Sequence, residues 1–247
     1  MRAHGGATGV IVAGGSIAGL CAGMALRNIG HDVHIYERAV GPMVSRGAGI
    51  VVQDDLLRLL RRYNIPEPLT VACSRRRYLV PDGGEGIAIA SAERFTSWSA
   101  IYHTLRASFP AERYHLGSTV KSFEQDTQGV IARFAERADA GADLLVCADG
   151  SFSEMRPRLL PEVRPQYAGY IAWRGALDED AAPPELTRFF DESLTFCGAR
   201  SGAHILCYFI PGRDVSAEQD RRQLDWVWYV KVPDGPGGYR SSASRRF

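Results

Sequence analysis

Three glycines and one acidic residue near the start of the chain have a spacing that can serve ligand chemistry. Gly14 and Gly15 directly follow an apolar run, Gly19 comes one helical turn later, and Glu37 ends a second apolar run. A glycine at position 14 allows a tight turn out of a strand, and one at position 19 lets a helix pack closely on that strand. An acidic side chain about 20 positions further on can accept hydrogen bonds from both hydroxyls of a ribose. This pattern predicts a nucleotide-binding strand–helix–strand unit.

The middle position of the Gly-x-Gly-x-x-Gly pattern is occupied by Ser16 instead of glycine. Its hydroxyl either crowds a pyrophosphate or donates a hydrogen bond to it. The phosphates would lie at the N-terminus of a helix expected over residues 17–29. The nucleotide-binding candidates are therefore Gly14, Gly15, Ser16, Ile17, Ala18, Gly19, Glu37 and Arg38.

A second polar group follows the apolar run 144–148, which we expect to form a buried strand. It begins with Asp149 and Gly150, and Ser153 and Arg156 follow at intervals of three. Because parallel strands bring their C-terminal ends to one crevice, Asp149 is expected beside the glycine turn. Between the two groups, the glycine-rich stretch 46–49 is expected to form a loop that faces the ligand.

Composition limits the partners of the chain. The 247 residues include 29 basic and 28 acidic side chains, a balance that favours neither nucleic acid nor an anionic membrane as partner. The five cysteines contain no Cys-x-x-Cys pair, which indicates a reducing cytoplasm. No stretch has the length of a membrane span, so we expect a soluble, cytoplasmic protein. The spacing of His31 and His34 is interpreted as accidental, and no metal is expected.

Alternating strand and helix patterns predict an α/β fold with a parallel sheet, crossed by an antiparallel hairpin over 119–135. The first domain is expected over residues 1–160, with 73–92 contributed to the second domain. The second domain, over 161–236, is expected to be an incomplete and mostly antiparallel sheet. Residues 237–247 are expected to be a disordered tail.

These motifs together resemble those of the FAD-dependent aromatic hydroxylases, a family of flavoprotein monooxygenases. Segments 167–175 and 208–213 resemble the branch that acts on hydroxylated N-heteroaromatic rings such as hydroxypyridines. The resemblance implies a Rossmann-like FAD/NAD(P)-binding domain, FAD as cofactor, NADH or NADPH as reductant, and a small aromatic substrate. It also implies that Asp149 and Gly150 approach the ribose or pyrophosphate of FAD, and that Arg46 lies close to the flavin.

Two features depart from that family. Tyr102 stands where many members carry an arginine, and the family's later Gly-Asp motif has no counterpart before the chain ends at Phe247. We therefore expect a C-terminally truncated chain that is inactive as it stands. Its expected protein partner is a second copy or a complementing C-terminal polypeptide.

For the substrate, His204 and Tyr208 share one face of an expected strand and could bind a ring hydroxyl. The competing interpretation, a packed inner face of the sheet, is favoured, and no catalytic residue is named. Two other functions stay open. An NAD(P)-dependent dehydrogenase would leave the Asp149-Gly150 motif unexplained, and no tyrosine has a lysine four residues later. The other is a non-catalytic fragment or split subunit that retains only nucleotide binding.

Overall fold

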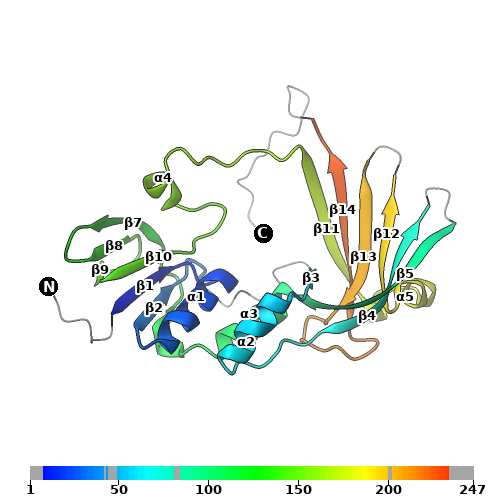
Figure 1. Cartoon of the computed structure of the whole chain (residues 1–247), viewed down its shortest axis with the longest axis horizontal. Coiled ribbons are helices and arrows are strands. Elements are labelled where there is room, and N and C mark those ends of the chain that lie inside the picture. Colours follow the sequence, from blue (N-terminus) through cyan, green and yellow to red (C-terminus); the bar gives the residue numbers. More distant parts are fainter. Residues whose placement is uncertain (1–7, 42, 44–48, 81–83, 200–201, 234–247) are drawn as a thin grey trace. The chain divides into compact units, whose positions relative to one another are not determined.

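The computed structural model of the chain describes residues 8–41, 43, 49–80, 84–199 and 202–233 (Figure 1). Contacts within the chain divide it into two compact units. The first unit comprises residues 1–46, 53–68 and 99–165, and the second comprises residues 47–52, 69–98 and 166–247.

A four-stranded parallel sheet forms the centre of the first unit. Its order is β10 (Leu144–Cys147), β1 (Gly9–Ala13), β2 (Asp32–Tyr36) and β6 (Tyr114–His115). Helix α1 (Ile17–Asn28) connects β1 to β2, as the motif predicts. Apolar runs suit strands of this kind, because a parallel sheet is usually covered on both faces.

Strand β10 differs from the expectation of a buried strand. Leu144 and Cys147 are exposed, because within the described residues β10 pairs only with β1. The predicted hairpin is confirmed as part of a small antiparallel sheet that packs Val120 and Ala132 against Ile11 and Tyr36. The other elements of this unit and its borders are α2 (Asp54–Arg62), α3 (Trp98–Ala107), η1 (Ala111–Arg113), β7 (Val120–Gln125), β8 (Val130–Phe134), β9 (Ala140–Ala142) and α4 (Arg156–Leu159).

The second unit is built on a seven-stranded sheet in the order β11-β14-β13-β12-β4-β5-β3. Its pairs are antiparallel except for β12 and β4, which run parallel. All four tryptophans of the chain belong to this unit. Its elements are β3 (Gly49–Val51), β4 (Val71–Leu79), β5 (Glu85–Ser97), β11 (Tyr170–Asp178), η2 (Glu179–Ala181), α5 (Pro184–Phe190), β12 (Ser193–Gly198), β13 (His204–Ile210) and β14 (Gln223–Lys231).

The observed division differs in detail from the expected domain limits. Strand β5 runs on to Ser97 and keeps residues 93–97 in the second sheet, and β3 adds residues 49–51 from far upstream. Long-range pairing of this kind leaves no local sequence signal, because each strand is identified by its own pattern and not by its partner.

Candidate nucleotide-binding site

The glycine turn after β1 has the close contacts that its motif predicts. Gly14 has a φ of +101° and donates its N–H to the Tyr36 carbonyl at 2.8 Å. A Cβ on Gly14 would lie 3.0 Å from the Asp149 Cα, and a Cβ on Gly19 would overlap the Gly14 carbonyl oxygen. Only glycine fits these two positions, because backbone from the turn and from the two residues that follow β10 fills the space of a side chain.

The N-terminus of α1 is open to an anion. Ser16 is the N-cap residue, its side chain makes no capping hydrogen bond, and the first turn holds no acidic residue. The first N–H groups of a helix have no partner within the helix, and the helix dipole favours negative charge there. Ser16 and Ile17 are half-buried and Ala18 is exposed, so the turn combines packed and accessible backbone.

Glu37, immediately after β2, is anchored by the backbone of the same turn. Its side chain is buried, and Oε2 accepts the Gly15 N–H at 2.7 Å. The other oxygen, Oε1, accepts the Ala39 N–H at 2.8 Å. An ionised carboxylate has about four acceptor sites, so each oxygen retains capacity for a further donor. The neighbouring Arg38 is exposed.

Asp149 lies beside the glycine turn, as the sheet geometry predicts. Strands β1 and β10 are parallel neighbours, and the Ala148 N–H continues their pairing with a 2.8 Å bond to the Ala13 carbonyl. Asp149 Oδ2 accepts the Glu154 N–H at 2.8 Å, and Gly150 has a φ of +83°. The carboxylate therefore shapes its own loop in addition to any role toward a ligand.

The spacing of the motif after Asp149 has a structural reason. Ser153 Oγ accepts the Arg156 N–H at 2.8 Å, at the start of the short helix α4. The Arg156 guanidinium donates back to the Gly150 carbonyl at 2.7 Å and to the Ser151 carbonyl at 2.9 Å. These bonds connect the loop that follows β10 to the start of α4.

Sequence reasoning missed Tyr114 as part of this site. Its hydroxyl donates to the Gly15 carbonyl at 2.8 Å, and the Tyr102 hydroxyl lies 3.3 Å from it. Tyr114 belongs to β6, far from the motif in sequence, and no spacing rule connects the two. Tyr102 is buried in α3, in place of the arginine that many members of the resembled family carry.

The remaining predicted residues lie elsewhere. Arg46 falls outside the described residues, and His204 and Tyr208 are both on β13 in the second unit. Tyr208 is buried and stacks on Phe95 with 4.4 Å between ring centroids. His204 is exposed and stacks on Tyr229 at 4.9 Å. The structure supports the packed-face interpretation for Tyr208, whereas His204 stays accessible.

An acidic residue that the sequence did not single out lies beside Tyr208. Asp225 is paired with Tyr208 across β13 and β14 and is only 2% exposed. Burial raises the pKa of Asp225, although the Gly49 N–H, the Tyr208 hydroxyl and the Arg174 charge act in the opposite direction. Burial likewise raises the pKa of Tyr208, and the nearby Asp225 charge adds to the effect.

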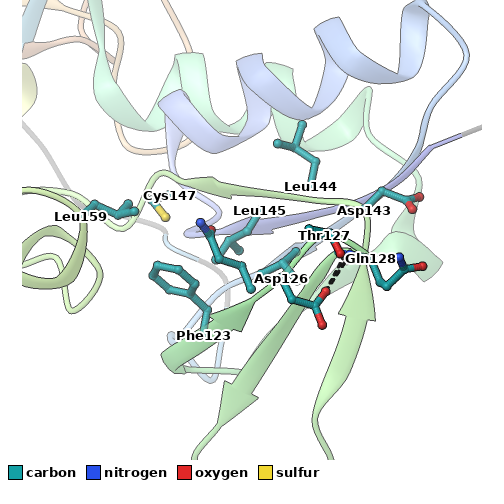
Figure 2. A pocket seen from close by; sticks show the side chains of 12 residues that line it. Phe123, Asp126, Thr127, Gln128, Asp143, Leu144, Leu145, Cys147 and Leu159 are labelled. Carbon is teal, nitrogen blue, oxygen red and sulfur yellow. Dashed lines mark hydrogen bonds between the residues drawn. The ribbon is translucent and has the colours of Figure 1, made fainter. Parts of the chain in front are cut away.

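A separate hollow of about 640 Å³ lies in the first unit beside β10 (Figure 2). Apolar side chains, among them Phe123, Leu145 and Leu159, line it together with the polar turn at Asp126. The Asp126 carboxylate accepts the Gln128 N–H at 2.7 Å and so stabilises that turn. The candidate nucleotide-binding residues are not part of this lining.

The described part of the chain offers neither a metal cluster nor a membrane-spanning helix. Among those residues, no three or more His, Cys, Asp or Glu side chains are grouped closely enough to hold a metal ion. Within the same residues, no helix has both the length and the apolar character needed to cross a membrane.

Comparison with known proteins shows similarity along most of the chain. A family model described as FAD binding domain-like matches residues 167–242. The 2,6-dihydroxypyridine 3-monooxygenase of Paenarthrobacter nicotinovorans is 37% identical over 229 residues, which cover 92% of this chain and 56% of that protein. The FAD-dependent urate hydroxylase of Klebsiella pneumoniae is 32% identical over 212 residues, covering 76% of this chain and 51% of that protein.

A solved structure is similar over most of the chain as well. The 2,6-dihydroxypyridine-3-hydroxylase from Arthrobacter nicotinovorans matches with a TM-score of 0.84 and 35% identity, over 93% of this chain and 57% of that one. The chain thus spans about half the length of the curated relatives it matches. The family-model match lies in the second unit, whereas the glycine turn lies in the first. The family-model match and the glycine-turn motif therefore rest on different residues.

Proposed function

Because this chain is similar over most of its length to FAD-dependent hydroxylases, we propose that its first unit binds FAD through the adenosine diphosphate portion. The observation that carries the proposal is the glycine turn with Glu37 fixed beside it. Gly15 and Ala39 hold both carboxylate oxygens through N–H bonds of 2.7 and 2.8 Å. A preorganised acceptor of this kind loses little freedom when it binds a ribose.

The residues fit the parts of FAD in order. The pyrophosphate would meet the open N-terminus of α1, where the backbone from Ser16 to Gly19 supplies N–H donors. The ribose hydroxyls would donate to Glu37. Asp149 and Gly150 would border the same groove from the end of β10, because a Cβ on Gly14 would lie only 3.0 Å from the Asp149 Cα. Arg46 is proposed to lie near the flavin on the family resemblance alone.

For the whole protein we propose hydroxylation of a hydroxylated aromatic or N-heteroaromatic ring, a hydroxypyridine for instance, with NADH or NADPH and dioxygen as co-substrates. Bound FAD would supply the redox chemistry. The second unit would contribute the surface that orients the ring, with His204 as the accessible polar group. Tyr208 is proposed to support this surface from within, because its hydroxyl is buried beside Asp225.

The FAD proposal is tested by titrating FAD into the wild-type protein and into Glu37→Gln, with binding followed by calorimetry. Replacing a charged acceptor should weaken binding by about 1 to 3 kcal/mol. The matched control is Glu124→Gln, which neutralises an exposed carboxylate on β7 in the same unit. Equal affinity of all three proteins would reject the assignment of Glu37.

The reaction is tested separately on the whole protein, by incubating it with FAD, NADH or NADPH, and a series of hydroxypyridines. Mass spectrometry should detect a product heavier by one oxygen atom. A product in which labelled dioxygen contributes no oxygen would contradict the proposed monooxygenase chemistry.

A further inference from the structure

One hydrogen bond fixes the direction of a peptide group in the glycine turn. The Tyr114 hydroxyl donates to the Gly15 carbonyl at 2.8 Å, while the Gly15 N–H donates to Glu37 at 2.7 Å. A Cβ on Gly15 would overlap the Tyr114 hydroxyl, so the ring packs directly against the bare backbone. Both polar atoms of Gly15 are thus committed to side chains of the protein.

The direction of that carbonyl matters for an anion. A site that binds a pyrophosphate through backbone presents N–H groups and must keep carbonyl oxygens away. Glycine tolerates both signs of φ, so a peptide group next to it can turn over at lower cost than one between other residues. A Gly15 carbonyl that turned toward the phosphates would repel them.

Tyr114 is itself well supported. The Arg106 guanidinium lies over its ring, 4.3 Å from the ring centroid. Because the Tyr114 hydroxyl donates its only proton to Gly15, the Tyr102 hydroxyl at 3.3 Å must be the donor in their contact. A hydroxyl that accepts one hydrogen bond becomes a better donor in the next. Burial raises the pKa of Tyr114, so it retains its proton throughout the neutral range.

We propose that Tyr114 is a positioning residue for the phosphate portion of the nucleotide, assisted by Tyr102. It acts through the Gly15 carbonyl, which it keeps turned away from the anion. This inference rests on the proposed binding of FAD by the first unit. It predicts that loss of the Tyr114 hydroxyl weakens the binding of ligands with phosphates but not the binding of the nucleoside alone.

The experiment compares the binding of ADP and of adenosine to wild-type protein and to Tyr114→Phe. The variant should bind ADP about tenfold more weakly, the effect of losing one hydrogen bond, and adenosine within about twofold of wild type. Glu37→Gln is the contrasting variant, because it should weaken both ligands alike. Tyr63→Phe, a change in the same unit outside the turn, is the matched control and should alter neither affinity.

Equal changes for ADP and adenosine, or no change for either, in Tyr114→Phe would overturn the inference. If that variant does not fold, Tyr102→Phe tests the same contacts, with an expected loss of about two- to threefold for ADP only. No loss, or an equal loss for both ligands, would then overturn it. Failure of the wild-type protein to bind ADP or FAD at all would instead reject the proposed function.

Discussion

The glycine turn of the first unit and the Tyr208 region of the second unit use buried polar groups in opposite ways. In the turn, each Glu37 carboxylate oxygen and both polar backbone atoms of Gly15 have a hydrogen-bond partner. In the second unit, the Asp225 Oδ2 atom is buried and makes no hydrogen bond to a described residue. The first arrangement fixes the acceptor oxygens of a candidate binding surface, whereas the second carries a desolvation cost.

The second unit also contains a buried ion pair that has a further charged neighbour. Arg222 and Glu179 are both buried, and Arg222 Nε donates to Glu179 Oε2 at 2.8 Å. A second carboxylate, Asp191, lies 3.0 Å from the same guanidinium. The contrast with Asp225 lies in the partners: Glu179 accepts hydrogen bonds from a buried guanidinium, whereas Asp225 Oδ2 has no hydrogen-bond partner among the described residues.

Removing Glu179 should give the largest effect. Glu179→Ala leaves Arg222 buried with only Asp191 as a charged partner, and we expect a loss of about 3 kcal/mol in the free energy of unfolding. Urea denaturation measures it. Asp214→Ala is the control, because it breaks an exposed ion pair with Arg221 and an exposed hydrogen bond from the Ser216 N–H, and it should cost less than about 1 kcal/mol. Similar losses in the two variants would show that the buried pair contributes no more to the free energy of unfolding than the exposed pair.

Gly19→Ala should give the next largest effect, this time in the first unit. The new Cβ would overlap the Gly14 carbonyl, so α1 must shift from β1. Overpacking of this kind costs about 1 to 3 kcal/mol and should also abolish nucleotide binding. Gly141→Ala is the matched control, because a Cβ there meets nothing within 4 Å. Retained FAD affinity in Gly19→Ala would contradict the tight-turn account.

Asp225→Asn should change how stability depends on pH. Burial raises the pKa of Asp225 in the folded state above that of an aspartate in the unfolded chain, so its contribution to stability is fully present below the unfolded pKa. The contribution is lost as pH rises through the folded pKa, because the buried carboxyl must then ionise or the chain unfold. Asparagine does not ionise, so the variant should lack this loss. Urea denaturation from about pH 4 to pH 7 tests this, and parallel profiles would refute it.

The smallest effect is expected at a histidine pair in the first unit. His34 Nδ1 and His115 Nε2 lie 2.9 Å apart, and burial followed by the Arg137 charge lowers the pKa of both rings. Their contribution to stability is present above the usual histidine pKa of about 6.5 and is lost as pH falls. The thermal midpoint should therefore drop less on acidification in His34→Gln/His115→Gln than in wild type. An identical drop would rule out the pair as a source of acid sensitivity.

The elements and contacts that depend on local spacing could be predicted from the sequence alone. The turn from Gly14 to Gly19, the helix behind it, Glu37 at the end of β2 and the position of Asp149 could all be predicted, because strand order and parallel pairing follow from a strand–helix–strand pattern. The comparisons bear out the predicted resemblance to FAD-dependent hydroxylases, which extends over 92% of this chain.

Contacts between distant strands could not be predicted in the same way. Tyr114 reaches Gly15 from β6, and Gly49, Tyr208 and Asp225 come together from three strands. A strand's alternation shows which residues share its own face, but not which strand will lie opposite or in which register. The register shows that Tyr208 faces Asp225 and that Trp226 and Trp228 are turned to the other side of the sheet.

Because all four tryptophans belong to the second unit, their intrinsic fluorescence is a natural probe of that unit. Trp98, Trp173, Trp226 and Trp228 lie on or next to strands of the seven-stranded sheet, so intrinsic emission excited at the indole band originates from that sheet. A denaturation curve recorded by fluorescence therefore follows the second unit, whereas loss of nucleotide affinity follows the first. If the two curves have different midpoints, the two units unfold independently. If the two curves coincide, the two units unfold in one cooperative transition.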